Sequence, residues 1–244
     1  MRAALVTGAA GGIGRAVVER LVADGVGVLA VDLSADSTTP GEPFAADLMT
    51  RDGNRASVEA AVERFGRLDI VVANAGFQHV APIEDFPEDR WDAMNALLLT
   101  SPFLLAKYAW RHLRASGSGR FVAVASAHAI VASPFKAGYV AAKHGVLGLV
   151  KTLALEGAAD GIAATAVCPG YVRTPLVEHQ IAAQARANGI PEDRVLQDII
   201  LAPHAVKRLI EPAEVAELVA FLAGPAGAVI TGVPVMMDAG WTAH

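Results

Sequence analysis

Residues 3–14 read Ala-Ala-Leu-Val-Thr-Gly-Ala-Ala-Gly-Gly-Ile-Gly. Ala3–Val6 is a short apolar run that predicts a buried strand, and residues 15–23 follow with a helical pattern. The order strand, glycine-rich turn, helix is typical of a phosphate site, because glycines allow a tight turn and the helix N-terminus offers free N–H groups. A plain glycine-rich turn would also fit the glycines taken alone.

The same alternation continues along the chain. Further buried strands are expected at Val26–Val31, Ile70–Ala73, Arg120–Ala125, Ala163–Val167 and Val233–Met237, and helices at Asn54–Phe65, Arg90–Ala115, Tyr139–Gly157 and Glu211–Ala223. Ser34–Pro43 is expected to be a polar loop. Strands alternating with helices predict an α/β fold, a Rossmann-type doubly wound parallel sheet with helices on both faces. Ligands of such sheets bind beyond the C-terminal ends of the strands.

Length and composition favour one domain over residues 1–244. The chain is 53% hydrophobic and 18% charged, and its net charge of −5 gives no reason to expect nucleic acid as a partner. Cys168 is the only cysteine, which excludes an intrachain disulfide and fits a reducing compartment. The first strand leaves no room for a signal peptide, and no apolar run is long enough to span a membrane. A cytoplasmic location is therefore expected.

The second strand ends in Asp32, eighteen residues after Gly14. An acidic side chain at this place can accept hydrogen bonds from both ribose hydroxyls of an adenosine, and it would repel a 2′-phosphate. The sequence therefore predicts NAD rather than NADP as cofactor. The alternative is an aspartate that merely ends a strand.

Tyr139 and Lys143 are four residues apart on a predicted helix, and Ser126 lies thirteen residues before the tyrosine. An i, i+4 pair shares one helix face. A neighbouring ammonium favours a phenolate, which matters because an unperturbed tyrosine is only about one part in a thousand ionised at neutral pH. A serine hydroxyl could hold a substrate oxygen against the phenol. We interpret the trio as a proton-transfer device for an alcohol or ketone, although the pair alone is more often surface packing.

Several motifs in the correct order resemble the short-chain dehydrogenase/reductase family over essentially the whole chain. They are Thr7-Gly8 with Gly12 and Gly14, Asn74-Ala75-Gly76, the Ser126–Tyr139–Lys143 set, and Pro169-Gly170. The resemblance implies a homotetramer, with Lys143 on the nicotinamide ribose. It also implies that NAD is held by Gly8, Gly12, Ile13, Gly14, Asp32, Asp47, Leu48, Asn74, Ala75, Gly76, Tyr139, Lys143, Pro169, Gly170, Val172 and Thr174.

Local segments of the chain resemble the bacterial D-3-hydroxybutyrate dehydrogenases within that family. The segments are residues 77–84, 126–136, 174–181 and 240–243. The resemblance implies a substrate lid at about residues 175–210 and a small anionic hydroxy or keto acid as substrate. Its carboxylate would be held by Gln78, His128, Lys136 and Gln180, its hydroxyl by Ser126 and Tyr139, with Trp241 as a further substrate contact. Lysine supplies charge and glutamine supplies N–H donors; each residue singly could also be structural.

The chain departs from the family pattern at identifiable places. Leu98 stands where the family has a catalytic asparagine, which helps to place the lysine through a water. Asn95, one helical turn earlier, could approach the same region. Tyr171 replaces a tryptophan common in 3-hydroxybutyrate enzymes, which could alter the size of the pocket, and Thr165 replaces a common asparagine. The segment between Asp32 and Asp47 is short, so the usual intervening helix is expected to be missing or reduced.

Two other interpretations remain open. One is a short-chain dehydrogenase for another hydroxy acid or a secondary alcohol, favoured by the changes at Leu98 and Tyr171. The other is an NAD-binding regulatory protein with weak catalysis, which Leu98 favours and the intact trio disfavours. The histidines show no metal-ligand spacing with cysteines or carboxylates, so no metal is expected.

Overall fold

The centre of the fold is a seven-stranded parallel sheet with the strand order β3-β2-β1-β4-β5-β6-β7. The computed structural model describes residues 1–35, 40–178 and 180–243. The strands are β1 (Ala3–Thr7), β2 (Gly27–Asp32), β3 (Glu42–Ala45), β4 (Ile70–Ala73), β5 (Arg120–Val124), β6 (Ala163–Pro169) and β7 (Pro234–Met237). Every pair of neighbouring strands is parallel. The predicted Rossmann-type α/β sheet is confirmed.

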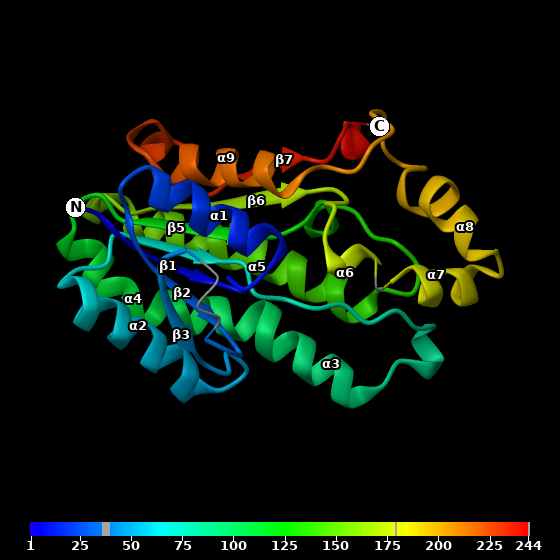
Figure 1. The fold of residues 1–244 in the computed structure, drawn as a ribbon, viewed down its shortest axis with the longest axis horizontal. Helices are drawn as coiled ribbons and strands as arrows, with labels where there is room; N and C mark the ends of the chain where they lie inside the picture. The colour runs from blue at the N-terminus through cyan, green and yellow to red at the C-terminus, as the bar shows by residue number, and fades with distance from the viewer. Residues whose placement is uncertain (36–39, 179, 244) are drawn as a thin grey trace.

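Helices cover both faces of the sheet (Figure 1). On one face lie α1 (Gly12–Ala23) and α9 (Pro212–Ala223), which pack against each other. On the other lie α2 (Arg51–Phe65), α4 (Ser101–Ala115) and α5 (Ala137–Gly157). Two separate hydrophobic cores result, one on each face, with alternate side chains of the central strands pointing into each. Because both faces are covered, β1, β4, β5 and β6 are buried along their whole length.

Two parts of the chain differ from the expected elements. The strand β3 (Glu42–Ala45) begins within the expected polar loop Ser34–Pro43, of which residues 36–39 lie outside the described residues. The expected helix over Arg90–Ala115 is divided into α3 (Glu88–Asn95), a π-helical turn over Ala96–Thr100, and α4. No helix lies between Asp32 and Asp47 in the described part of that segment, as expected.

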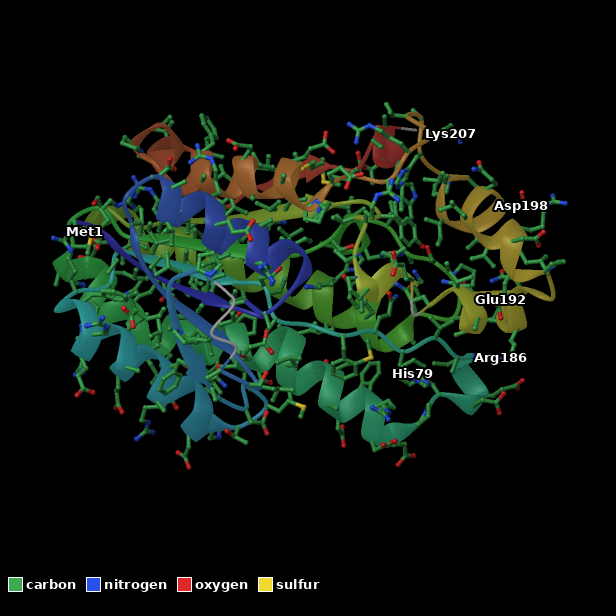
Figure 2. The ribbon with its side chains drawn as sticks, in the orientation of Figure 1. Met1, His79, Arg186, Glu192, Asp198 and Lys207 are labelled. Atoms are coloured by element: carbon green, nitrogen blue, oxygen red, sulfur yellow. The ribbon has the colours of Figure 1, made fainter. Side chains whose placement is uncertain are left out.

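A group of short helices extends beyond the C-terminal ends of the strands (Figure 1). It comprises α6 (Pro175–Glu178), α7 (Ile181–Asn188), α8 (Glu192–Val195) and a π-helical turn over Leu196–Ile200. Its inner side chains form a hydrophobic cluster of their own with Tyr171 and Leu209. Its outer surface carries exposed charges, among them Arg186, Glu192 and Asp198 (Figure 2). These helices occupy the segment for which a substrate lid is predicted.

Candidate active site

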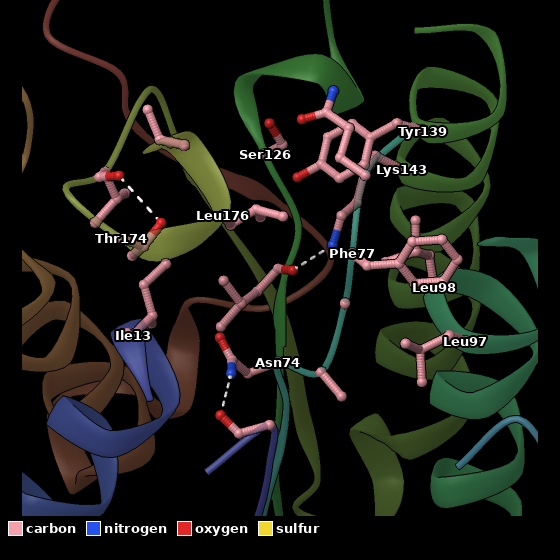
Figure 3. A pocket seen from close by; sticks show the side chains of 18 of the residues that line it. Ile13, Asn74, Phe77, Leu97, Leu98, Ser126, Tyr139, Lys143, Thr174 and Leu176 are labelled. Carbon is pink, nitrogen blue, oxygen red and sulfur yellow. Dashed lines mark hydrogen bonds between the residues drawn. The ribbon is translucent and has the colours of Figure 1, made fainter. Parts of the chain in front are cut away.

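A deep cleft opens at the C-terminal edge of the sheet, beside the switch point between β1 and β4 (Figure 3). The structure brings nearly all of the predicted site residues together there. The lining includes Gly8, Gly12, Ile13, Asp32, Asp47, Leu48, Asn74, Ala75, Gly76, Gln78, Ser126, His128, Lys136, Tyr139, Lys143, Pro169, Gly170, Val172, Thr174, Gln180 and Trp241. The one predicted site residue outside the lining is Gly14. A Cβ at this position would lie 1.9 Å from the Gly8 carbonyl oxygen, so Gly14 serves close packing of α1 against the turn.

The glycine turn leaves room for a phosphate. Gly8 and Gly12 have φ of +65° and +53°, conformations that side chains rarely adopt. Gly11 precedes α1, lines the cleft, and would place a Cβ in open space. It offers no side-chain cap to the helix, and the first turn carries no acidic residue. The free N–H groups and positive end of α1 therefore fit the pyrophosphate of a dinucleotide.

Asn74 and Thr7 hold the glycine turn in place. The Asn74 Nδ2 donates to the carbonyl oxygens of Thr7 and Gly8, at 2.9 and 3.3 Å. The Thr7 Oγ1 accepts from the backbone N–H groups of Asn74 and Ala75, at 3.0 and 3.1 Å. These bonds join the ends of β1 and β4 across the switch point. The bridging role of Thr7 could be recognised in the sequence only through its place in the Thr-Gly motif.

Two carboxylates line the nucleotide end of the cleft. Asp32 ends β2 and accepts hydrogen bonds from the backbone N–H of Ala10 (2.9 Å) and of Leu33 (2.8 Å). Asp47 accepts from the N–H of Met49 at 2.9 Å. The first pair of bonds fixes the Asp32 carboxylate beside the glycine turn, where it remains partly exposed to the cleft. A fixed negative charge at this position suits ribose hydroxyls and disfavours a phosphate.

Ser126, Tyr139 and Lys143 converge at the middle of the cleft (Figure 3). Ser126 follows β5 and caps a 3₁₀ turn over Ala127–Ala129, and the other two lie on the first turns of α5. The Lys143 Nζ donates to the carbonyl oxygen of Val124 at 2.8 Å and lies 5.5 Å from the centre of the Tyr139 ring. The three side chains therefore lie in one cleft, on two segments that are separate in the sequence.

Burial, rather than the charge of Lys143, determines the pKa of the Tyr139 phenol. Burial raises the pKa of the phenol to about 12, and the hydrogen bond with Ser126 lowers it only in part. Burial also lowers the pKa of the Lys143 ammonium to about 8. Desolvation of the phenolate therefore sets the direction of the pKa shift. Tyr139 is a neutral phenol at rest, and it must lose a proton before it can accept one.

Lys136 also lines the cleft and is 1% exposed. Its Nζ donates to the Tyr171 hydroxyl at 2.9 Å, and burial lowers its pKa to about 7. Tyr171 in turn stacks on Trp241, with ring centres 5.5 Å apart. Phe135, immediately before the lysine, has a φ of 67°, a strained conformation for a residue with a side chain. Burial of the Lys136 ammonium and strain in the backbone at Phe135 both cost free energy. A cation kept inside the protein in this way is suited to binding an anion.

Two glutamine amides in the same cleft have unsatisfied atoms. The Gln78 Nε2 and the Gln180 Oε1 are buried without a hydrogen-bond partner, and both side chains line the cleft. An unpaired buried polar atom costs about 1–3 kcal/mol, so both atoms are ready for a ligand. Gln78 presents a donor, as predicted. Gln180 instead uses its Nε2 on the Leu176 carbonyl at 2.9 Å, and its amide must rotate before it can donate to a carboxylate.

His128 differs from the expected carboxylate donor, because both of its ring nitrogens are engaged. Nδ1 lies 3.4 Å from the Ser126 Oγ, and Nε2 lies 2.9 Å from the Ser133 Oγ. Burial, with a smaller contribution from the charge of Lys136, lowers the pKa of the imidazole to about 3. The ring is therefore neutral. The contact with Ser133 has no signal in the sequence motifs.

Leu98 fills the place of the family's asparagine with apolar surface. It is 2% exposed and packs with Met94, Ala142 and Phe77. A Cβ on Gly76 would meet it at 2.7 Å. Asn95 does not replace the missing amide, since its Nδ2 donates to the Trp91 carbonyl at 3.0 Å and its side chain does not line the cleft. The expectation for Asn95 is therefore wrong.

His204 is a buried histidine outside the lining of the cleft. Its Nε2 accepts from the Tyr171 N–H at 3.4 Å, and its Nδ1 lies 3.3 Å from the Arg208 carbonyl oxygen. A Cβ on Gly170 would meet the ring at 2.9 Å. His204 thus ties the segment after the short helices to the turn that follows β6. In the described ranges, no group of three or more histidine, cysteine and acidic side chains could hold a metal ion.

The fold and the cleft define an oxidoreductase of the dinucleotide-binding α/β class. A family described as enoyl-(acyl carrier protein) reductase matches residues 8–242. The chain belongs to the short-chain dehydrogenase/reductase family, whose members use nicotinamide cofactors. It is an enzyme of that family.

Relatives of known description cover the whole chain. A D-beta-hydroxybutyrate dehydrogenase of Rhizobium meliloti is 43% identical over 100% of this chain and 99% of its own. A protein of the same description from Cupriavidus necator is 38% identical, covering 100% and 98%. A cis-4-hydroxycyclohexanecarboxylate dehydrogenase of Sinomonas cyclohexanicum is 36% identical, covering 99% and 97%. The crystal structure of levodione reductase superimposes with a TM-score of 0.90 at 32% identity, covering 99% and 98%.

Proposed function

We propose that the protein is an NAD-dependent dehydrogenase that interconverts D-3-hydroxybutyrate and acetoacetate. The observation that carries the proposal is the buried Lys136 and the unpaired Gln78 amide nitrogen, which line the same cleft as Ser126 and Tyr139. Together they offer one positive charge and one free N–H to a carboxylate. Two relatives described as D-beta-hydroxybutyrate dehydrogenases support the choice of acid.

NAD would lie with its pyrophosphate over Gly11–Gly12 and with its adenosine ribose at Asp32. The fixed Asp32 carboxylate supports NAD over NADP, because a 2′-phosphate at this place would meet a negative charge. The protein residues present fit the cofactor, since the free end of α1 faces the cleft and the glycines leave it open. When bound, NAD supplies the acceptor for the hydride.

The residues of the chain orient the acid and handle its proton. Lys136 and Gln78 grip the carboxylate, and rotation of the Gln180 amide adds a third donor. Ser126 and Tyr139 bind the hydroxyl, and Tyr139 as phenolate takes its proton as the carbon loses hydride. Lys143 has a pKa of about 8, so it is mainly an ammonium at neutral pH and can bind the nicotinamide ribose. His128 contributes to the same wall of the site, edge-on to Trp241 with ring centres 4.9 Å apart.

The test is NAD reduction followed with each enantiomer of 3-hydroxybutyrate. The proposal expects NADH formation with the D enantiomer and little with the L enantiomer. Absence of turnover with both, in a preparation that binds NAD, would refute the substrate assignment.

A second candidate is a short-chain dehydrogenase for another hydroxy acid or a secondary alcohol. Tyr171 favours it, since a tyrosine hydroxyl 2.9 Å from Lys136 changes the lining of the acid end. A relative described as a cis-4-hydroxycyclohexanecarboxylate dehydrogenase acts on a larger hydroxy acid. A panel of hydroxy acids and neutral alcohols with NAD separates the two candidates.

We further propose that the protein works as a homotetramer in the cytoplasm, and that residues 175–210 act as a lid over the substrate. The resemblance to the family supports the tetramer. Pro175, Leu176 and Val177 of α6 line the cleft together with Gln180, and this supports the lid. Within the described residues, no helix is long and apolar enough to cross a membrane.

A further inference from the structure

Tyr139 needs a route by which its proton reaches solvent. Its pKa of about 12 means that the phenol is protonated at rest, and each turnover in the oxidising direction leaves another proton on it. The family relay places a water at the lysine through the asparagine that Leu98 replaces. Here Tyr139 packs against an apolar cluster of Met94, Leu98 and Ala142. That side of the phenol offers no acceptor among these three side chains.

The opposite side of Tyr139 carries a chain of hydrogen-bonding groups. Ser126 lines the cleft with Tyr139, and its hydroxyl is close enough to lower the pKa of the phenol. The Ser126 Oγ lies 3.4 Å from the His128 Nδ1, and the His128 Nε2 lies 2.9 Å from the Ser133 Oγ. Ser133 is only half-buried and lies in the loop before α5, between the exposed residues Ala132 and Pro134. Each link is a group that can both accept and donate a proton.

We propose that Ser126, His128 and Ser133 form a proton relay that connects Tyr139 to solvent in place of the family's route. The proposal rests on the proposed alcohol oxidation. It assigns a proton-transfer role to Ser133, and it gives His128 a second role beside the substrate. The nearby Cys168 thiol does not compete as an exit, because its sulfur is buried at the end of β6.

The transfer balances proton by proton. The Tyr139 O–H bond breaks as its proton passes to the Ser126 oxygen, and the Ser126 proton passes to the His128 Nδ1. The Nε2–H bond of His128 breaks as its proton passes to the Ser133 oxygen, which releases its own proton to water. The starting tautomer returns by proton exchange with water: Nε2 regains a proton through Ser133, and the Nδ1 proton leaves through Ser126, which lines the cleft, once the product has left. Because the ring receives one proton as it gives up another, it need not become a stable cation inside the protein.

The test compares Ser133→Thr with Ser133→Val, which have nearly the same shape and differ by the hydroxyl. The rate of NADH formation in the first turnover is measured by stopped flow, so that product release does not contribute. In dilute buffer the valine variant should be slower by about tenfold. This is less than the loss of a group that exchanges a proton with the substrate itself, because water reaches the outer end of the relay. Added imidazole should restore the rate, and the threonine variant should match the wild type.

Two results would overturn the relay. One is a valine variant as fast as wild type in dilute buffer, and the other is a slow variant that imidazole does not rescue, which would mark a structural role. If the wild type forms no NADH from 3-hydroxybutyrate, the substrate assignment fails instead, and the comparison is made with whichever alcohol the panel identifies. Nitrogen NMR of the cofactor-free protein gives a second readout: the His128 Nε2 resonance should shift in the valine variant alone, and an unchanged resonance contradicts the contact.

Discussion

Lys136→Met should make the protein more stable, and by an amount that depends on pH. Lys136 is 1% exposed, and within the part of the chain that the structure describes no carboxylate forms a salt bridge with it. Its pKa falls from 10.5 to about 7 on burial. Each pKa unit corresponds to about 1.36 kcal/mol, so the native state holds the charged lysine at a cost of about 5 kcal/mol below pH 7.

The sign follows from proton binding. Between about pH 7 and 10.5 the unfolded chain binds the lysine proton while the native protein does not, so the free energy of unfolding rises with pH through this window. Between about pH 6 and about pH 9, this one group raises the free energy of unfolding of the wild type by about 3 kcal/mol. A methionine at this position does not titrate and adds nothing. The stabilisation by Lys136→Met should therefore shrink by about 3 kcal/mol, which is roughly 6–12 °C in Tm for a chain of this size.

Differential scanning calorimetry of both proteins at the two pH values measures this difference, and other titrating groups cancel in the comparison. Lys151→Met is the matched control, because Lys151 lies on the exposed face of α5. A Tm difference between wild type and Lys136→Met that is the same at both pH values would refute the reasoning.

Three further predictions concern activity. Tyr139→Phe should lower kcat by a factor of about a hundred or more while calorimetric NAD binding is retained; near-normal turnover contradicts the assigned role. Asp32→Ser should raise kcat/KM with NADP relative to NAD, as measured with both cofactors, and an unchanged preference would remove Asp32 as the selecting residue. The KM for the acid should rise about tenfold from pH 6 to pH 8, because the Lys136 ammonium, with a pKa of about 7, is then about nine-tenths deprotonated. A flat KM over this range would argue against Lys136 as the carboxylate ligand.

The sequence predicts the sheet well where the physics is local. Apolar runs such as Ile70–Ala73 form buried strands because a sheet covered on both faces has no solvated side. The edge strand Glu42–Ala45 is not predicted in this way, because it is not a continuous apolar run. Its residues alternate in exposure, and it contains Pro43, which only an edge strand tolerates. The short helices after Pro175 are also missed, because they are stabilised by tertiary contacts with Tyr171 and Leu209 rather than by a long periodic pattern.

The residues that line the cleft are similarly predictable from the sequence, but their pKa values and hydrogen-bond partners are not. Motif residues come together because they follow parallel strands whose C-terminal ends meet at one edge. The direction of the Tyr139 pKa shift depends on how deeply the phenol is buried, which spacing to Lys143 does not reveal. The engagement of His128 depends on Ser133, and the orientation of the Gln180 amide depends on the Leu176 carbonyl. Such partners are set by tertiary structure alone.

The central claim is that a buried ammonium selects an anionic alcohol for oxidation at Tyr139. The most direct measurement is the ratio of kcat/KM for D-3-hydroxybutyrate to that for 2-butanol, compared between wild type and Lys136→Met. Loss of a buried charged partner of a carboxylate costs about 2–5 kcal/mol, so the ratio should fall by about thirtyfold or more in the variant. An unchanged ratio would contradict the account.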